Sequence, residues 1–124
     1  MDVNNIFELD LRQQKDLGNA LDILLDSRQV LSSVAGTDLA GFIRDEKIHG
    51  AVLYRLLTIT EAAKRLSAAF CERNRTIDWE KWRRLEIPLS NEYEMGYLIG
   101  VWSLLQAEVP PMISVLSEIV PEES

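Results

Sequence analysis

Four polar side chains that could take part in binding or catalysis lie close together in the second half of the sequence: Arg84, Glu86, Asn91 and Tyr93. An arginine holds anions, a carboxylate repels them, and a tyrosine offers a hydroxyl group. Asn91 forms hydrogen bonds but exchanges no proton near neutral pH. Arg84 could therefore contact an anion and Asn91 could hold a substrate, whereas acid–base catalysis needs a side chain that titrates near pH 7, usually a histidine.

Other reactive residue types are expected to play structural roles. His49 is the only histidine and lies far in sequence from Tyr93, so we expect it at the surface or at the start of a helix. Cys71 has no nearby base and is expected to be an inert, small apolar residue. Glu61 is spaced to pair with Arg65 on a helix, or else to line a cleft. No glycine-rich phosphate loop or metal-ligand spacing occurs, so no cofactor is expected.

Apolar residues recur at helical spacing along the chain, which predicts an all-α fold. The first helix is expected over about residues 10–33, followed by Gly36 as a stop and by a short second helix that Thr37 caps. The third helix is the clearest, because its apolar stripe covers residues 52–70 before an exit near Asn74.

The remaining elements are expected to contain two more helices. Asp78 should cap a short helix that carries two tryptophans and ends before Pro88, with a bend over residues 88–96. Apolar residues then keep one helical phase over residues 98–119 across Pro110 and Pro111, which predicts a single kinked helix. The long stripes are buried only if four to five helices pack together, so we expect an up-and-down antiparallel helical bundle. Its tryptophans should lie in the core or in a dimer interface rather than stack on bases.

Length and composition predict one cytoplasmic domain over residues 1–120, with a frayed tail over residues 121–124. The N-terminus lacks the pattern of a signal peptide, no apolar run is long enough for a membrane span, and the single cysteine fits a reducing compartment. A net charge of −7 argues against general attraction to nucleic acid, so DNA is not expected as a partner. Residues 64–84 are locally basic, which indicates either solvated helix faces, the reading we favour, or a basic surface.

Several stretches resemble the HepT-like proteins of the HEPN superfamily, in an order that covers roughly residues 20–120. The resemblance lies in Ala51-Val52-Leu53, Arg55-Leu56 and Glu61 to Ser67 of the central helix, and in Ile77-Asp78-Trp79, Val101-Trp102 and Val109-Pro110-Pro111 downstream. One departure is Thr60, which replaces the glycine that usually precedes the glutamate in that helix.

The resemblance implies a metal-independent ribonuclease toxin that acts as a homodimer and is silenced by a nucleotidyltransferase antitoxin. Activity in the family is attributed to an arginine, four to six residues, a histidine, and a tyrosine two residues beyond. The alignment places the tyrosine on Tyr93, the histidine on Asn91 and the arginine on Glu86. A shift by two residues puts Arg84 at the arginine position, where it could contact a phosphate, but it restores no histidine.

These changes favour a protein with weakened or lost ribonuclease activity that acts by binding RNA or a partner. Loss of acid–base assistance costs a factor of about 10² to 10⁴ in rate. A carboxylate about 4 Å from a phosphate adds a repulsion of roughly 4 kcal/mol at an effective dielectric constant near 20. Two alternatives stay open: an active RNA endonuclease that uses Arg84 and Tyr93, and a substrate-binding subunit of a two-component nucleotidyltransferase. Tyr93 then either faces RNA, receives a modification from the antitoxin, or anchors the bend.

Overall fold

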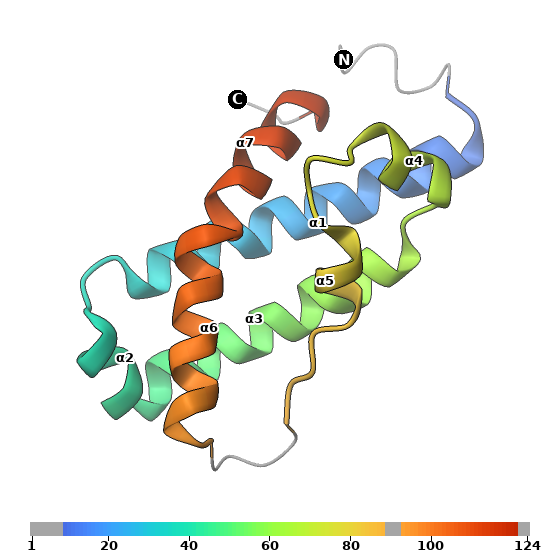
Figure 1. Cartoon of the computed structure of the whole chain (residues 1–124). Coiled ribbons are helices and arrows are strands. Elements are labelled where there is room, and N and C mark those ends of the chain that lie inside the picture. The colour runs from blue at the N-terminus through green and yellow to red at the C-terminus, as the bar shows by residue number, and fades with distance from the viewer. Residues whose placement is uncertain (1–8, 89–92, 122–124) are drawn as a thin grey trace.

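The structure is a computed structural model that describes residues 9–88 and 93–121, and within these ranges it contains helices and no strands. The helices are α1 (Leu11–Val34), α2 (Leu39–Arg44), α3 (Glu46–Arg65), α4 (Ala68–Arg73), α5 (Trp79–Arg83), α6 (Met95–Ala107) and α7 (Val109–Ile119). Figure 1 shows α1 and α3 running antiparallel along the length of the molecule, with α5, α6 and α7 packed across them. The all-α fold and the antiparallel packing are thus confirmed. The expected count of four to five helices is too low, because two predicted helices are each divided.

The first long helix agrees with its prediction to within one residue at each end. Asp10 caps α1 by accepting a hydrogen bond from the backbone N–H of Gln13 at 2.8 Å, and the Gln13 side chain accepts one from the backbone of Asp10 at 3.0 Å. This reciprocal capping box satisfies two donors that a helix start otherwise leaves free.

The cap of α2 lies one residue later than expected. Thr37 was expected to cap this helix, but the side chain of Asp38 accepts the N–H of Gly41 at 2.8 Å. Asp38 has the extended backbone that precedes the first helical residue, and aspartate is the stronger capping residue. Gly41 lies so close to Thr37 that a Cβ atom there would collide with the Thr37 hydroxyl.

The predicted third helix is divided into α3 and α4. Leu66 adopts an extended backbone at the end of α3, and Ser67 then caps α4 by accepting the N–H of Phe70 at 3.1 Å. Asp16 of α1 fixes this break, because its carboxylate accepts the Ser67 N–H at 2.8 Å and the Ser67 hydroxyl at 2.6 Å. Asp16 is only 3% exposed, so the two hydrogen bonds satisfy a carboxylate that is buried between helices.

The last predicted helix is kinked, as expected, and forms α6 and α7 with a bend of 40° at Glu108. The two prolines lie in the first turn of α7, where a missing N–H costs no helical hydrogen bond. Lys81 of α5 contacts Glu108 with its ammonium group at 2.7 Å and so links α5 to the kink. The expected cap of α5 is confirmed, because Asp78 accepts the N–H of Lys81 at 3.1 Å.

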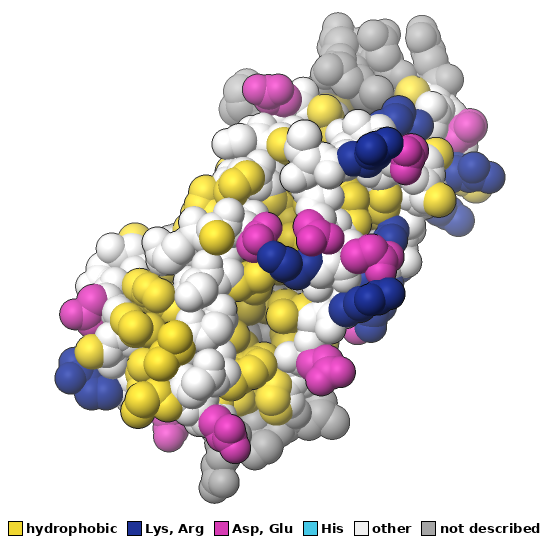
Figure 2. Space-filling view, viewed as in Figure 1, with side chains coloured by type: hydrophobic (Ala, Val, Ile, Leu, Met, Phe, Trp, Pro, Cys, Tyr) yellow, Lys and Arg dark blue, Asp and Glu magenta, His cyan; other side chains and the backbone are white. Residues whose placement is uncertain are grey.

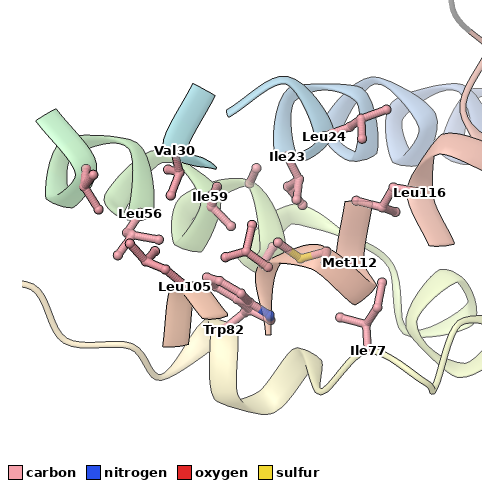
Figure 3. Packing of buried hydrophobic residues seen from close by; sticks show 14 of the residues in the cluster. Ile23, Leu24, Val30, Leu56, Ile59, Ile77, Trp82, Leu105, Met112 and Leu116 are labelled. Carbon is pink, nitrogen blue, oxygen red and sulfur yellow. The ribbon is translucent and has the colours of Figure 1, made fainter. Parts of the chain in front are cut away.

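The buried core lies between α1, α3, α5, α6 and α7, and Trp82 is its largest fully buried side chain at 1% exposure. Figure 3 shows Trp82 close to Leu105 and Met112, with side chains of α1 and α3 on the far side. Trp79 is buried as well, and Trp102 is half-buried against this core. The expectation that the tryptophans pack in the interior is therefore confirmed for Trp79 and Trp82.

No single helix in the described part of the chain is long and apolar enough to cross a membrane, although the bent pair of α6 and α7 together reaches that length and composition.

Candidate functional site

Tyr93 is half-buried just before α6 and belongs to a continuous row of aromatic rings. Its ring meets the imidazole of His49 at right angles, with a centroid distance of 5.7 Å, and stacks on Tyr97 at 5.9 Å. The row continues from His49 to Phe42 at 6.0 Å and from Phe42 to Trp102 at 5.4 Å. These five rings, the aromatic row, join α2, α3 and α6 around one end of the molecule.

The position of His49 corrects the sequence prediction in part. His49 does lie in the first turn of α3, as expected, but it is 5% exposed rather than a surface residue, and it is in contact with Tyr93. The signal for burial was present, since the stripe that contains Val52 and Leu56 extends back by three residues to position 49. The contact with Tyr93 joins positions 44 residues apart, and no local pattern predicts it.

The imidazole of His49 is held by one hydrogen bond that fixes its proton. Nδ1 lies 2.9 Å from the backbone carbonyl oxygen of Phe42. A carbonyl oxygen only accepts, so Nδ1 must carry a proton in this contact. In the neutral ring the other nitrogen, Nε2, therefore keeps its lone pair.

Two adjoining hollows open beside this pair of rings. One has a volume of about 420 Å³ and the other of about 300 Å³, and both are lined by Glu46, His49 and Tyr93. The first is completed by Ile43, Arg44, Met95 and Leu98, and the second by Lys47 and Gly50. The ionisable side chains of the lining thus include two cations and one carboxylate beside an imidazole and a phenol.

Of the other predicted site residues, Arg84 and Glu86 do not join Tyr93 in these hollows. Arg84 is 82% exposed in its side chain and pairs with Glu80 at 3.1 Å. Glu86 is exposed, and only its backbone carbonyl takes part in the region, where it accepts a hydrogen bond from the Tyr97 hydroxyl at 2.9 Å. Neither side chain lines the two hollows. Asn91 lies outside the residues that the structure describes.

Burial raises the pKa of the Tyr97 phenol above its usual value, and the neighbouring Tyr93 raises it further. The Tyr97 hydroxyl therefore stays protonated and continues to donate to Glu86 above the pH at which an ordinary tyrosine ionises. This contact ties Glu86, in the segment that follows α5, to α6.

The basic stretch over residues 64–84 is largely paired with carboxylates. Ion pairs link Lys64 to Glu61, Arg75 to Glu72, Lys81 to Glu108, and Arg83 and Arg84 to Glu80. In Figure 2 the Lys and Arg side chains over α4 and α5 alternate with Asp and Glu side chains. This arrangement favours the interpretation as solvated helix faces over a continuous surface for phosphates.

The predicted pair of Glu61 with Arg65 is wrong. Glu61 contacts Lys64 at 3.4 Å, whereas Arg65 donates to the side chain of Asn19 on α1 at 3.0 Å. Asn19 replaces Glu61 as the partner of Arg65 because α1 and α3 pack along most of their lengths.

Cys71 shows the features of an unreactive thiol. Burial raises the pKa of its thiol, although Arg83 donates a hydrogen bond to the sulfur at 2.8 Å and opposes this shift. A thiol with a raised pKa is a poor nucleophile at neutral pH. This agrees with the expected inert role.

The structure contains a further pocket of about 290 Å³ between α1, α4 and the end of α7. Its lining is mostly apolar, and the oxygens of its buried carboxylate, Asp16, already accept hydrogen bonds from Ser67. Within residues 9–88 and 93–121, no group of three or more His, Cys, Asp or Glu side chains is placed to hold a metal ion.

The outer face of α6 is unusually apolar for a helix at the surface. No charged residue occurs from Met95 to Ala107, and Met95 is 63% exposed with Ile99 exposed beside it. Figure 2 shows hydrophobic side chains gathered over α6 and α2. Apolar surface of this kind marks sites of protein association.

Comparison with known proteins gives one family. The family profile described as HepT-like, Ribonuclease HepT-like, matches residues 23–119, which span α1 from its middle through the end of α7. No curated protein and no solved structure gives a significant match to the chain.

Proposed function

The chain belongs to the HepT-like ribonuclease family, and from this premise we propose that it is a toxin–antitoxin type protein whose ribonuclease activity is weakened. In this proposal it acts mainly by binding RNA or a protein partner. The family membership supports the proposed substrate class and context, and the residues at the site support the proposed loss of activity.

One observation carries the proposal. In the predicted alignment only Tyr93 is kept of the three side chains that the family's activity is attributed to, and the hollows at Tyr93 are lined by neither Arg84 nor the carboxylate of Glu86. The amide of Asn91 can hold a substrate but cannot remove the proton of a 2′-hydroxyl group. We therefore expect cleavage to be slower than in a protein with an intact motif by a factor of about 10² to 10⁴.

The proposed partners are a second copy of the chain and a nucleotidyltransferase antitoxin. The uncharged face of α6 supports the first, since an exposed apolar helix face is stabilised when a two-fold related copy covers it. The second follows from the family alone. Tyr93 is half-buried yet lines two open hollows, so its position is compatible with modification by such a partner.

The proposal is tested by restoring the motif. Cleavage of a labelled single-stranded RNA is followed in metal-free buffer with protein in excess, for the natural chain and for the variant Glu86→Arg with Asn91→His. We expect the restored variant to cleave at least 100 times faster than the natural chain. A Tyr93→Ala and Arg84→Ala double variant, purified identically, controls for contaminating ribonuclease.

Two results would overturn the proposal. A natural chain that cleaves as fast as the restored variant would mean that the changes at positions 86 and 91 do not weaken activity. Failure of the natural chain to bind RNA or to form a complex with itself or a nucleotidyltransferase would remove the binding role.

A further inference from the structure

We propose that His49, with Arg44, forms a relocated RNA-cleavage site around Tyr93, in which His49 removes the proton from the attacking 2′-hydroxyl group. The inference rests on the proposed function, and it concerns where the remaining activity arises. His49 and Arg44 belong to α3 and α2, outside the segment in which the family's motif lies.

The geometry of His49 suits a general base. Its Nδ1 is held on the Phe42 carbonyl at 2.9 Å, which leaves the lone pair on Nε2, and its ring is packed between Phe42 and Tyr93. A base that is held in one tautomer and one orientation loses little entropy when substrate binds. His49 is largely buried, but it is part of the lining of both hollows beside Tyr93, and the proposal places the substrate's 2′-hydroxyl group in one of them.

Arg44 supplies the cation that position 86 lacks. It is exposed at the end of α2 and lines the larger hollow together with His49 and Tyr93. Among residues 9–88 and 93–121 it forms no ion pair, in contrast to Arg84. Glu46 lines the same hollow, but Lys47 in the adjoining hollow offsets its charge. Each hollow alone is neutral, but the two together present Arg44 and Lys47 against the single carboxylate of Glu46, so a phosphate beside Arg44 lies in a region with one net positive charge.

The chemical step balances with these groups and water. Nε2 of His49 takes the proton of the 2′-hydroxyl, the 2′-oxygen attacks phosphorus, and the bond from phosphorus to the 5′-oxygen breaks. The leaving 5′-oxygen takes a proton from water, and the imidazolium returns its proton to the hydroxide that results. The products are a 2′,3′-cyclic phosphate and a 5′-hydroxyl end, and Arg44 balances the charge on the phosphate.

The test compares one substitution in two backgrounds. His49→Gln keeps a side-chain donor for the Phe42 carbonyl but removes the base, and it is made in the natural chain and in the Glu86→Arg, Asn91→His variant. In the natural chain we expect cleavage to fall at least 100-fold. In the restored variant, where the base stands at position 91, we expect a loss of less than threefold.

Further measurements separate chemistry from folding and binding. Affinity for an RNA whose 2′-hydroxyls are methylated should change less than threefold in His49→Gln, and added imidazole should recover part of the cleavage in His49→Ala. Arg44→Gln should weaken binding of that RNA by about tenfold. Arg12→Gln, an equal change of charge at an exposed position of α1, should leave the affinity unchanged. Melting temperatures show whether each variant is folded.

The outcomes distinguish this inference from the proposed function. Equal losses from His49→Gln in both backgrounds would assign His49 a structural role and overturn the inference, as would the absence of any cleavage by the natural chain above the level of the Tyr93→Ala and Arg84→Ala control. If the restored variant is no faster than the natural chain while His49→Gln still abolishes cleavage, the weakened activity is refuted and the role of His49 stands.

Discussion

The contact between Asp16 and Ser67 is expected to be one of the strongest polar contributions to stability in this fold. Asp16→Ala removes two hydrogen bonds to a charged acceptor, at 2.8 and 2.6 Å, each of which contributes about 1.5–3 kcal/mol. The substitution also removes a buried carboxylate, and the relief of its desolvation offsets part of this loss. We expect the free energy of unfolding to fall by about 2–4 kcal/mol.

A double-mutant cycle isolates the contact between the two side chains. Ser67→Ala removes the hydroxyl that donates to Asp16 and accepts from Phe70, but it leaves the backbone N–H that Asp16 also accepts. The coupling energy between Asp16→Ala and Ser67→Ala therefore reports the hydroxyl–carboxylate contact alone, and we expect about 1–2 kcal/mol. Asp16→Asn, which keeps one acceptor oxygen, should cost less than Asp16→Ala.

Urea unfolding measures these values through tryptophan fluorescence, because Trp79 and Trp82 are buried and become exposed when the chain unfolds. Unchanged slopes against urea concentration would show that the variants unfold to the same extent. A coupling energy below about 0.5 kcal/mol, or an Asp16→Ala variant as stable as the natural chain, would refute the argument that this contact fixes the break between α3 and α4.

Three further predictions concern single positions. Thr60→Val should raise the free energy of unfolding by about 1 kcal/mol in urea unfolding, because the Thr60 hydroxyl is buried with no hydrogen-bond partner in the described residues; a loss of similar size would contradict this. The pKa of Tyr97 is raised, so the unfolded chain releases this proton first and stability should fall as pH rises above about 10. Tyr97→Phe should remove this part of the pH dependence. In an absorbance titration, the folded natural chain should show a tyrosine that ionises at higher pH than an ordinary one, and the folded variant should lack it. Gly18→Ala, with open space around it, should raise the free energy of unfolding by about 0.5–1 kcal/mol, and Gly41→Ala should raise it by less, because the Thr37 hydroxyl must rotate away from the added Cβ; equal gains in urea unfolding would contradict this.

Local patterns predicted the parts of the fold that local interactions determine. The capping box at Asp10 and the cap at Asp78 depend on residues three positions apart, and both were found where the sequence placed the helix starts. The kink before α7 follows from two adjacent prolines in the same way. The break after α3 was missed because Asp16 stabilises it from 51 residues away, and the apolar stripe continues across the break.

In the candidate site, too, the sequence suggested one residue and missed a contact between residues that are distant in the chain. The resemblance predicts that Tyr93 stands at the family's tyrosine position, which stays a prediction, and the structure places Tyr93 beside open hollows. His49 was interpreted as remote, because sequence distance was taken as spatial distance. The first turn of α3 lies beside the residues just before α6 only in the folded chain, and this packing reveals that the single histidine contacts Tyr93.

The aromatic row gives the protein a built-in spectroscopic reporter. With one histidine in the chain, proton NMR of the imidazole shows a single pair of ring signals that needs no assignment by mutagenesis. The ring of Tyr93 meets that imidazole at right angles, so ring currents shift these signals by an amount that depends on where the tyrosine lies. Docking of RNA, covalent modification of the phenol or association with an antitoxin would each move the two signals, and Trp102 at the far end of the row offers a fluorescent counterpart.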